Sequence, residues 1–304
     1  MTAPAELEAV LEALAPRLGA PAGPPEALGG GITNRNFRVT LGTDDVVIRL
    51  PGNDTELLGI DRDAEHRASV AAADAGVGPE VLAYLEAERC LVTRFIRGRP
   101  LRPEELRTPQ LLGEAARALR AVHAGPPLPV AFDPWAIVEA HHRLAVERGA
   151  RIPAAHADAV ALAGRIRPLL QGPEHTPVPC HDDLLTANLL HDGRRLRIVD
   201  WEYAGMNDRF FDLANLSVNN GLEPEDDGLL LRAYFGAATP RRLARLRLMR
   251  LMSDFREAMW GVVQSAISEL DFDFGAYADE HFARMLAAGS GPAFEAWAEQ
   301  AEGR

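Results

Sequence analysis

The sequence predicts an α+β protein with two lobes, a small lobe built on antiparallel strands and a larger, mainly helical lobe. Two observations lead to this prediction. In the first third of the chain, apolar residues alternate with polar ones along short segments, which is the pattern of half-buried strands. Beyond residue 108, apolar residues recur at helical spacing over long segments. The 304 residues are enough for two such lobes with ample core.

The first lobe is expected at residues 1–95 and the second at residues 96–304, with a hinge near residues 93–98. A helix is expected over residues 4–18, and a stretch rich in Gly and Pro follows it. Strands are then expected at NFRVTL, DDVVIRL, EVLAYL and CLVTRFI. The turn GTDD joins the first two strands, and the helix DRDAEHRASVAAADAG separates the second from the third.

The second lobe begins after the segment RGRPLRPEEL, where the pattern becomes helical. Three short strands interrupt it at PVPCH, NLLH and LRIVD, and turns link them. The helices are expected at about residues 109–124, 133–149, 153–170, 208–219, 225–236, 240–269 and 276–302.

Composition and charge limit the possible functions. The net charge of −12 disfavours sequence-independent binding to nucleic acid or to an anionic membrane, and it is compatible with a cationic substrate. The sequence contains no lysine, so all 32 basic residues are arginine. A Walker A lysine, a Schiff-base lysine and a lysine general base are therefore excluded. A cationic side chain that contacts phosphate must be an arginine.

Other features indicate a cytoplasmic protein. Cys90 and Cys180 each lie beside an apolar run, which is typical of buried thiols and not of a disulfide framework. The N-terminal segment lacks the basic and apolar regions of a signal peptide. No apolar run approaches 18 residues, so we expect no membrane-spanning helix.

The strongest chemical motif is HDDLLTANLLHDGRRLRIVD, which begins at His181. In phosphoryl transfer to an alcohol, one carboxylate orients the hydroxyl, while an asparagine and a second carboxylate hold Mg²⁺. Asp183 fits the first role, and Asn188 and Asp200 fit the second. Because HDGRR is a turn signal, a hairpin should bring Asn188 close to Asp200, which we place at the end of a strand. His181 is expected to hold the loop through hydrogen bonds, since the sequence around it carries no zinc-binding pattern.

An ATP site requires a phosphate-covering loop, a cation on a strand and a glutamate that positions the cation. The cation is expected to be Arg49, on the strand face opposite Ile48, and its partner Glu65 on the following helix. The segment VTRFI at residues 92–96 is expected to offer backbone groups to adenine. The glycine-rich segment GGGITNRNF and this hinge supply the other candidates for ATP binding, which are Gly30, Gly31, Thr33, Asn34, Thr93 and Phe95.

These segments resemble the choline/ethanolamine kinase family, within the wider group that includes the aminoglycoside phosphotransferases. The resemblance covers about residues 28–270 and rests on GGITNRNF, VVIRLPG, DRDAEHRA, GVGPEV, LVTRFIRGRPL, HDDLLTANLL, LRIVDWEYAGMNDRFFDLAN and FREAMWGVVQ. It implies a protein-kinase-like bilobal fold, ATP, Mg²⁺, and transfer of the γ-phosphoryl group to a small alcohol. In this family Arg49 would replace the usual lysine. Asp182 departs from the asparagine or glycine that is usual between His181 and Asp183.

The resemblance also suggests the acceptor, a small cationic alcohol such as choline or ethanolamine. A quaternary ammonium is recognised by aromatic faces and carboxylates. Trp260 is the expected cage wall, Glu202 the expected counter-charge and Tyr203 a further contact, while Asp212 is expected to be structural. Trp260 could instead belong to the core of the helical lobe. An aminoglycoside or another small molecule is an alternative acceptor, and a nucleotide-binding pseudokinase is the non-enzymatic alternative.

Overall fold

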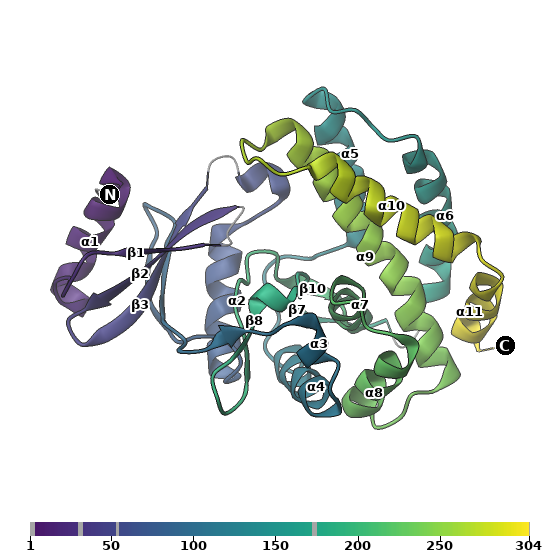
Figure 1. The fold of residues 1–304 in the computed structure, drawn as a ribbon, viewed down its shortest axis with the longest axis horizontal. Helices are drawn as coiled ribbons and strands as arrows, with labels where there is room; N and C mark the ends of the chain where they lie inside the picture. The colour runs from purple at the N-terminus through teal and green to yellow at the C-terminus, as the bar shows by residue number, and fades with distance from the viewer. Residues whose placement is uncertain (1–3, 30–32, 53–54, 172–174, 304) are drawn as a thin grey trace.

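The computed structural model describes residues 4–29, 33–52, 55–171 and 175–303, and it has two lobes (Figure 1). The expected residues Gly30 and Gly31 lie outside the described residues. Among the described residues, no helix combines the length and apolar character needed to cross a bilayer. The prediction of an α+β fold with an antiparallel-sheet lobe and a helical lobe is confirmed.

The smaller lobe is a five-stranded antiparallel sheet with strand order β1-β2-β3-β5-β4. The strands are β1 (Glu26–Leu28), β2 (Asn34–Leu41), β3 (Asp44–Pro51), β4 (Val81–Leu85) and β5 (Cys90–Arg94). Helix α1 (Ala5–Leu18) covers one face, where Leu7 and Leu14 pack with Val46 and Ile48 of β3 in a small core. Because side chains alternate along β3, the burial of Ile48 on this face turns Arg49 toward the other face.

Helix α2 (Arg62–Asp74) follows the short helix η1 (Thr55–Leu58) and lies between the sheet and the helical lobe (Figure 1). Asp61 caps its N-terminus by accepting hydrogen bonds from two backbone N–H groups. Ala68 and Ala72 of α2 belong to the large core of the second lobe. Helix α2 therefore carries Glu65 along the boundary between the two lobes.

The larger lobe is organised around helix α9 (Pro240–Ile267), which packs against α5 (Pro134–Glu147), α7 (Arg209–Asn219), α10 (Phe274–Ser290) and α11 (Ala293–Glu302). Its other helices are α3 (Pro103–Leu106), α4 (Pro109–His123), α6 (Ala155–Leu170) and α8 (Pro224–Phe235). Two small antiparallel sheets lie where this lobe meets the first. One pairs β7 (Pro177–Cys180) with β10 (Gly205–Asp208), and the other has the order β6 (Arg99–Pro100), β8 (Leu189–His191), β9 (Leu196–Ile198).

The structure corrects some expected elements. The single helix expected at residues 276–302 is two helices, because Gly291 and Pro292 interrupt it. Proline lacks the N–H group that would continue α10, and it is well suited to the start of a new helix. Strands β1, β6 and β10 were not expected, since each has four residues or fewer and shows little alternation. Strand β9 ends at Ile198, two residues before Asp200.

Candidate active site

Residues 181–188 of the HDDLLTANLL motif connect β7 to β8, and its last two residues begin β8. The side-chain amide of Asn188 donates to the backbone carbonyl of Asp183 at 2.9 Å and lies 3.4 Å from its carboxylate oxygen Oδ2. The β8–β9 hairpin then returns the chain, and the backbone N–H of Val199 donates to the carbonyl of Asn188 at 3.0 Å. Asp200 follows with a left-handed φ of 69°. The expected hairpin is confirmed, and it places Asp183, Asn188 and Asp200 in one region.

Arg49 connects this region to the first lobe. Its Nη1 donates to Oε1 of Glu65 at 2.8 Å and also forms an ion pair with Asp200. The Arg49 side chain is 14% exposed and the Glu65 side chain 3% exposed, so solvent screens this contact little. Although burial acts to lower the pKa of Arg49, the nearby carboxylates of Asp200 and Glu65 raise it above its usual value. Arg49 is thus a fixed positive charge between the lobes.

A cavity of about 510 Å³ lies between the lobes and is lined by residues of both. The first lobe contributes residues of β3, α2, β5 and the hinge segment, and the second lobe contributes residues just before and within β8 and residues 199–201 after β9. Six of the lining residues were candidates from the sequence for ATP or metal binding: Arg49, Glu65, Thr93, Phe95, Asn188 and Asp200. This volume lies within the range of small-molecule and cofactor sites.

The structure places Thr33, Asn34 and Glu202 together, and none of the three is among the residues that line this cavity. Glu202 is 7% exposed and accepts hydrogen bonds from the Thr33 hydroxyl and, at 2.8 Å, from the Asn34 side-chain amide. Arg62 also contacts Glu202, at 3.1 Å, and bonds Glu65 at 2.7 Å. Burial raises the pKa of Glu202 to about 7. The expected counter-charge of the acceptor is therefore engaged with the first lobe.

Asp183 lies beside a buried cation that sequence reasoning missed. Arg256 of α9 is 2% exposed, and its Nη1 lies 3.5 Å from Oδ1 of Asp183 and 2.7 Å from Oε1 of Glu257. Burial raises the pKa of Asp183 to about 8, although the positive charge of Arg256 acts in the opposite direction. The motif FREAMW contains Arg256 and Glu257, but its helical spacing alone does not show which of these side chains faces Asp183.

The aromatic residues expected near the acceptor lie next to this pair. The Nε1–H of Trp260 donates to the hydroxyl of Tyr203 at 3.2 Å. Trp260 is 8% exposed, and its ring makes edge contacts with Phe274 and Tyr277. Trp260 belongs to the large core, which is one of the two roles that the sequence left open, and its role as a cage wall stays a prediction.

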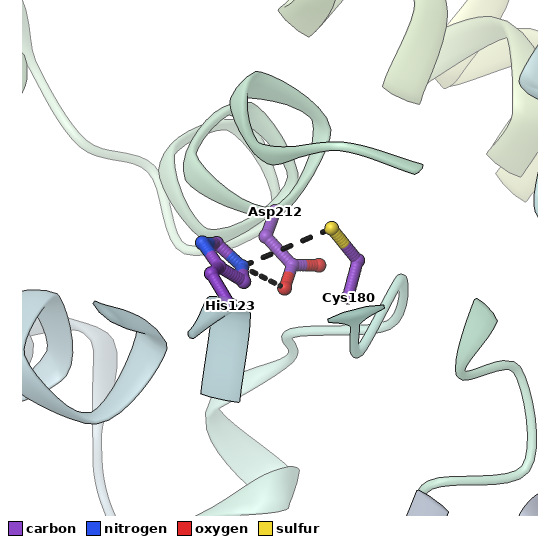
Figure 2. A group of neighbouring side chains, drawn as sticks. All are labelled: His123, Cys180 and Asp212. Atoms are coloured by element: carbon purple, nitrogen blue, oxygen red, sulfur yellow. Dashed lines mark hydrogen bonds and ion pairs between the residues drawn. The ribbon is translucent and has the colours of Figure 1, made fainter. Parts of the chain in front are cut away.

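Asp212 of α7 holds the loop by hydrogen bonds, and its side chain lies beside His123 and Cys180 (Figure 2). Its carboxylate accepts hydrogen bonds from the backbone N–H groups of His181 at 2.9 Å and of Asp182 at 2.8 Å. The ring Nε2 of His123 lies 2.9 Å from the same carboxylate, and the thiol of Cys180 lies 3.8 Å from this Nε2. Burial acts to raise the pKa of Asp212, but the hydrogen bond and charge of His123 lower it overall.

The atoms of His123, Cys180 and Asp212 lie close enough together to ligate a metal, all within 4.8 Å of one another. However, each already has a protein partner. The Nδ1 of His123 lies 2.7 Å from the Tyr234 hydroxyl, and the Cys180 thiol lies 3.7 Å from the carbonyl of Asn207. We therefore interpret the cluster as a buried hydrogen-bond network. Cys90 and Cys180 are both buried free thiols, as expected.

His181 completes the loop. Its side chain is buried, its Nε2 lies 2.9 Å from the carbonyl of Val199, and its ring packs edge-on against Trp201. The next residue, Asp182, has a left-handed φ of 66° and accepts a hydrogen bond from Asn207 at 2.8 Å. This backbone turn directs Asp182 inward and leaves the Asp183 side chain partly exposed.

Comparison with known proteins shows the family of the chain. Residues 25–248 match the model of the phosphotransferase enzyme family. Ethanolamine kinase 2 of Homo sapiens is 31% identical over 265 residues, which cover 77% of this chain and 67% of that protein. A choline/ethanolamine kinase family protein from Mesorhizobium loti has a TM-score of 0.84 and 36% identity, with 98% of this chain and 100% of that chain covered.

More distant structures share the fold. Choline kinase LicA from Streptococcus pneumoniae has a TM-score of 0.75 at 21% identity, with 93% of this chain and 98% of that chain covered. The fold and the matches define a kinase-like phosphotransferase that uses an alcohol as acceptor. The chain belongs to the phosphotransferase enzyme family and, within it, to the choline/ethanolamine kinase family.

Proposed function

We propose that the protein transfers the γ-phosphoryl group of ATP, with Mg²⁺, to the hydroxyl of a small amino alcohol, choline or ethanolamine. The observation that carries this proposal is the position of Asp183 beside Asn188, next to a cavity that also holds Arg49, Glu65 and Asp200. Such an arrangement has a carboxylate for the hydroxyl, oxygen donors for a metal and a fixed cation for phosphate. We infer a nucleotide-binding lobe at residues 1–95 and a catalytic lobe at residues 96–304.

Each side chain has a defined task in this proposal. The carboxylate of Asp183 accepts or orients the hydroxyl proton of the acceptor. Arg49, held by Glu65, donates to the phosphate oxygens of the nucleotide. Thr93 and Phe95 line the cavity, and in this proposal the hinge around them contacts adenine.

The donor set of the cavity suits magnesium. Asn188 and Asp200 both line it, and their carboxamide and carboxylate oxygens are the hard donors that Mg²⁺ prefers. When bound there, Mg²⁺ would neutralise charge on the phosphate oxygens.

Similar proteins support ATP as the phosphoryl donor and an amino alcohol as the acceptor. Human ethanolamine kinase 2 is named for an amino alcohol, and LicA has been crystallised in complex with AMP. An aminoglycoside phosphotransferase of the same fold has been crystallised with ADP and hygromycin B.

A coupled assay of ADP release tests the proposal with choline, ethanolamine, thiamine and aminoglycosides as acceptors. We expect turnover with choline or ethanolamine and loss of that turnover when Mg²⁺ is chelated. The Asp183→Asn variant should lose about 10²–10⁴-fold in kcat while nucleotide binding changes little. Preferential turnover of an aminoglycoside would refute the proposed acceptor, and full activity of Asp183→Asn would remove Asp183 from its role.

A further inference from the structure

A cation of the chain itself lies beside the proposed base. Arg256 is 2% exposed, and its Nη1 contacts Glu257 at 2.7 Å and lies 3.5 Å from Asp183. Glu257 is fixed in turn, because the Tyr277 hydroxyl donates to its Oε2 at 2.8 Å and the Asn219 amide lies 3.4 Å from its Oε1. The acid that holds Arg256 is therefore part of a built site and not a mobile surface charge.

Aromatic rings surround the same guanidinium. Its carbon Cζ lies 4.4 Å from the ring centroid of Tyr203 and 5.9 Å from that of Phe132. The Tyr203 ring is positioned by its hydrogen bond from Trp260. Both distances are within the range at which a cation is attracted by the face of an aromatic ring.

The guanidinium has few hydrogen bonds for its degree of burial. Its Nε and Nη2 are buried and have no hydrogen-bond partner among the described residues. Leaving buried donors without partners is costly, so the hydrogen bond to Glu257 does not by itself account for the position of Arg256. The two aromatic rings and two carboxylates do, and these are the groups by which proteins recognise a quaternary ammonium.

We propose that Arg256 occupies the cation cage of the acceptor site and thereby excludes a quaternary ammonium, which restricts the acceptor to alcohols with a primary ammonium. This inference rests on the proposed amino-alcohol kinase function. A trimethylammonium group cannot donate a hydrogen bond and depends on aromatic surface, and the guanidinium covers the Tyr203 face that it would need. A primary ammonium is smaller and donates three hydrogen bonds, so it can bind carboxylate oxygens without that face.

Equilibrium binding measured by calorimetry tests this proposal without requiring turnover. Choline and ethanolamine are titrated into the full-length wild type, the Arg256→Met variant and the Arg256→Met/Glu257→Gln variant. The double variant removes the cation together with Glu257, so the buried acid at 2.7 Å is not left unpaired if the single variant fails to fold. We expect the wild type to bind ethanolamine at least ten-fold more tightly than choline. At least one variant should bind choline ten-fold more tightly than the wild type does.

Arg247→Met is the matched control, because Arg247 lies on the same helix but stacks on Trp297, away from Asp183. This variant should keep the wild-type ratio of the two affinities. Equal binding of choline and ethanolamine by the wild type overturns the proposal, and so does the absence of a choline gain in both Arg256 variants. If neither amine is phosphorylated, the proposed function fails. The change in choline affinity in the Arg256 variants then still decides whether Arg256 fills a cation cage.

Discussion

Arg49 of the first lobe and Asp200 of the second form an ion pair across the boundary between the lobes. The same Arg49 nitrogen also bonds Glu65, so one guanidinium joins a strand, a helix and the loop after β9. Because Asp200 is also a proposed metal ligand, a bound Mg²⁺ would compete with Arg49 for this carboxylate. The arginine would still be held by Glu65, where it could contact phosphate.

The first prediction concerns Asp200. The Asp200→Asn variant should need at least ten-fold more Mg²⁺ for half-maximal activity, because an amide oxygen binds a hard cation less strongly than a carboxylate does. Titration of Mg²⁺ at saturating nucleotide and acceptor measures this requirement. Asp158→Asn, at an exposed position on α6, is the control and should behave as the wild type. An unchanged Mg²⁺ requirement in Asp200→Asn would exclude Asp200 as a metal ligand.

The second prediction concerns Glu65. Its two oxygens contact Arg49 at 2.8 Å and Arg62 at 2.7 Å, so Glu65→Gln should weaken the hold on Arg49, the cation that we propose contacts the nucleotide. A hydrogen bond to a charged group contributes about 1.5–3 kcal/mol, which corresponds to a roughly ten-fold or larger rise in the KM for ATP. The KM for the acceptor should change little.

Steady-state kinetics with each substrate varied in turn measures both constants for Glu65→Gln. Glu88→Gln, at an exposed turn in the same lobe, is the matched control. If Glu65→Gln raised both KM values equally, Glu65 would act on the whole structure and not on the nucleotide.

The grouping of the candidate site residues and the orientation of Arg49 could be predicted from the sequence because both depend on local backbone geometry. Asp183, Asn188 and Asp200 lie within 18 positions of one another, and a single hairpin brings them together. The orientation of Arg49 followed from strand alternation, because the burial of Ile48 sends the next side chain to the opposite face. Both inferences depend on local geometry, which a sequence pattern encodes well.

Contacts between distant segments could not be predicted in this way. Glu202 meets Thr33, which is 169 positions away, and Arg256 of helix α9 meets Asp183 in the loop after β7. Nothing in the spacing around Glu202 or Arg256 indicates these partners, since both depend on how the lobes and α9 pack. The lack of lysine nevertheless restricted the choice of cation at the site, because any permanently charged basic side chain there had to be an arginine.

The third prediction concerns Asp212. It is fully buried and accepts hydrogen bonds from two backbone N–H groups of the catalytic loop, and His123 lies against it. Removing one partner of a buried charged pair costs about 3–5 kcal/mol, so Asp212→Ala should lower the free energy of unfolding by that amount. Urea unfolding followed by circular dichroism measures the loss.

Asp279→Ala, at an exposed position on α10, is the control for Asp212→Ala. A double-mutant cycle with His123→Ala should show strong non-additivity, because the two side chains share one network. Additive effects of Asp212→Ala and His123→Ala would mean that the 2.9 Å contact contributes little to stability.

The fourth prediction is a dependence of stability on pH through His141 of α5. This side chain is 3% exposed, and burial lowers its pKa to about 4. The folded state therefore keeps the imidazole neutral, while the unfolded chain takes up a proton near pH 6.5. Its contribution is fully present above pH 6.5 and is lost as the pH falls from about 6.5 to about 4, by about 3 kcal/mol in all.

The comparison that isolates this effect is the difference in unfolding free energy between the wild type and His141→Gln, measured by urea unfolding from pH 7.5 to pH 4.5. Because glutamine does not titrate, the stability advantage of the wild type over the variant should shrink as the pH falls through this window. His142→Gln, at the neighbouring position on α5, is the control, and its difference in unfolding free energy from the wild type should change less with pH than that of His141→Gln. A difference between the wild type and His141→Gln that stays constant with pH would show that His141 is protonated equally in the folded and unfolded states, so that burial does not hold it neutral.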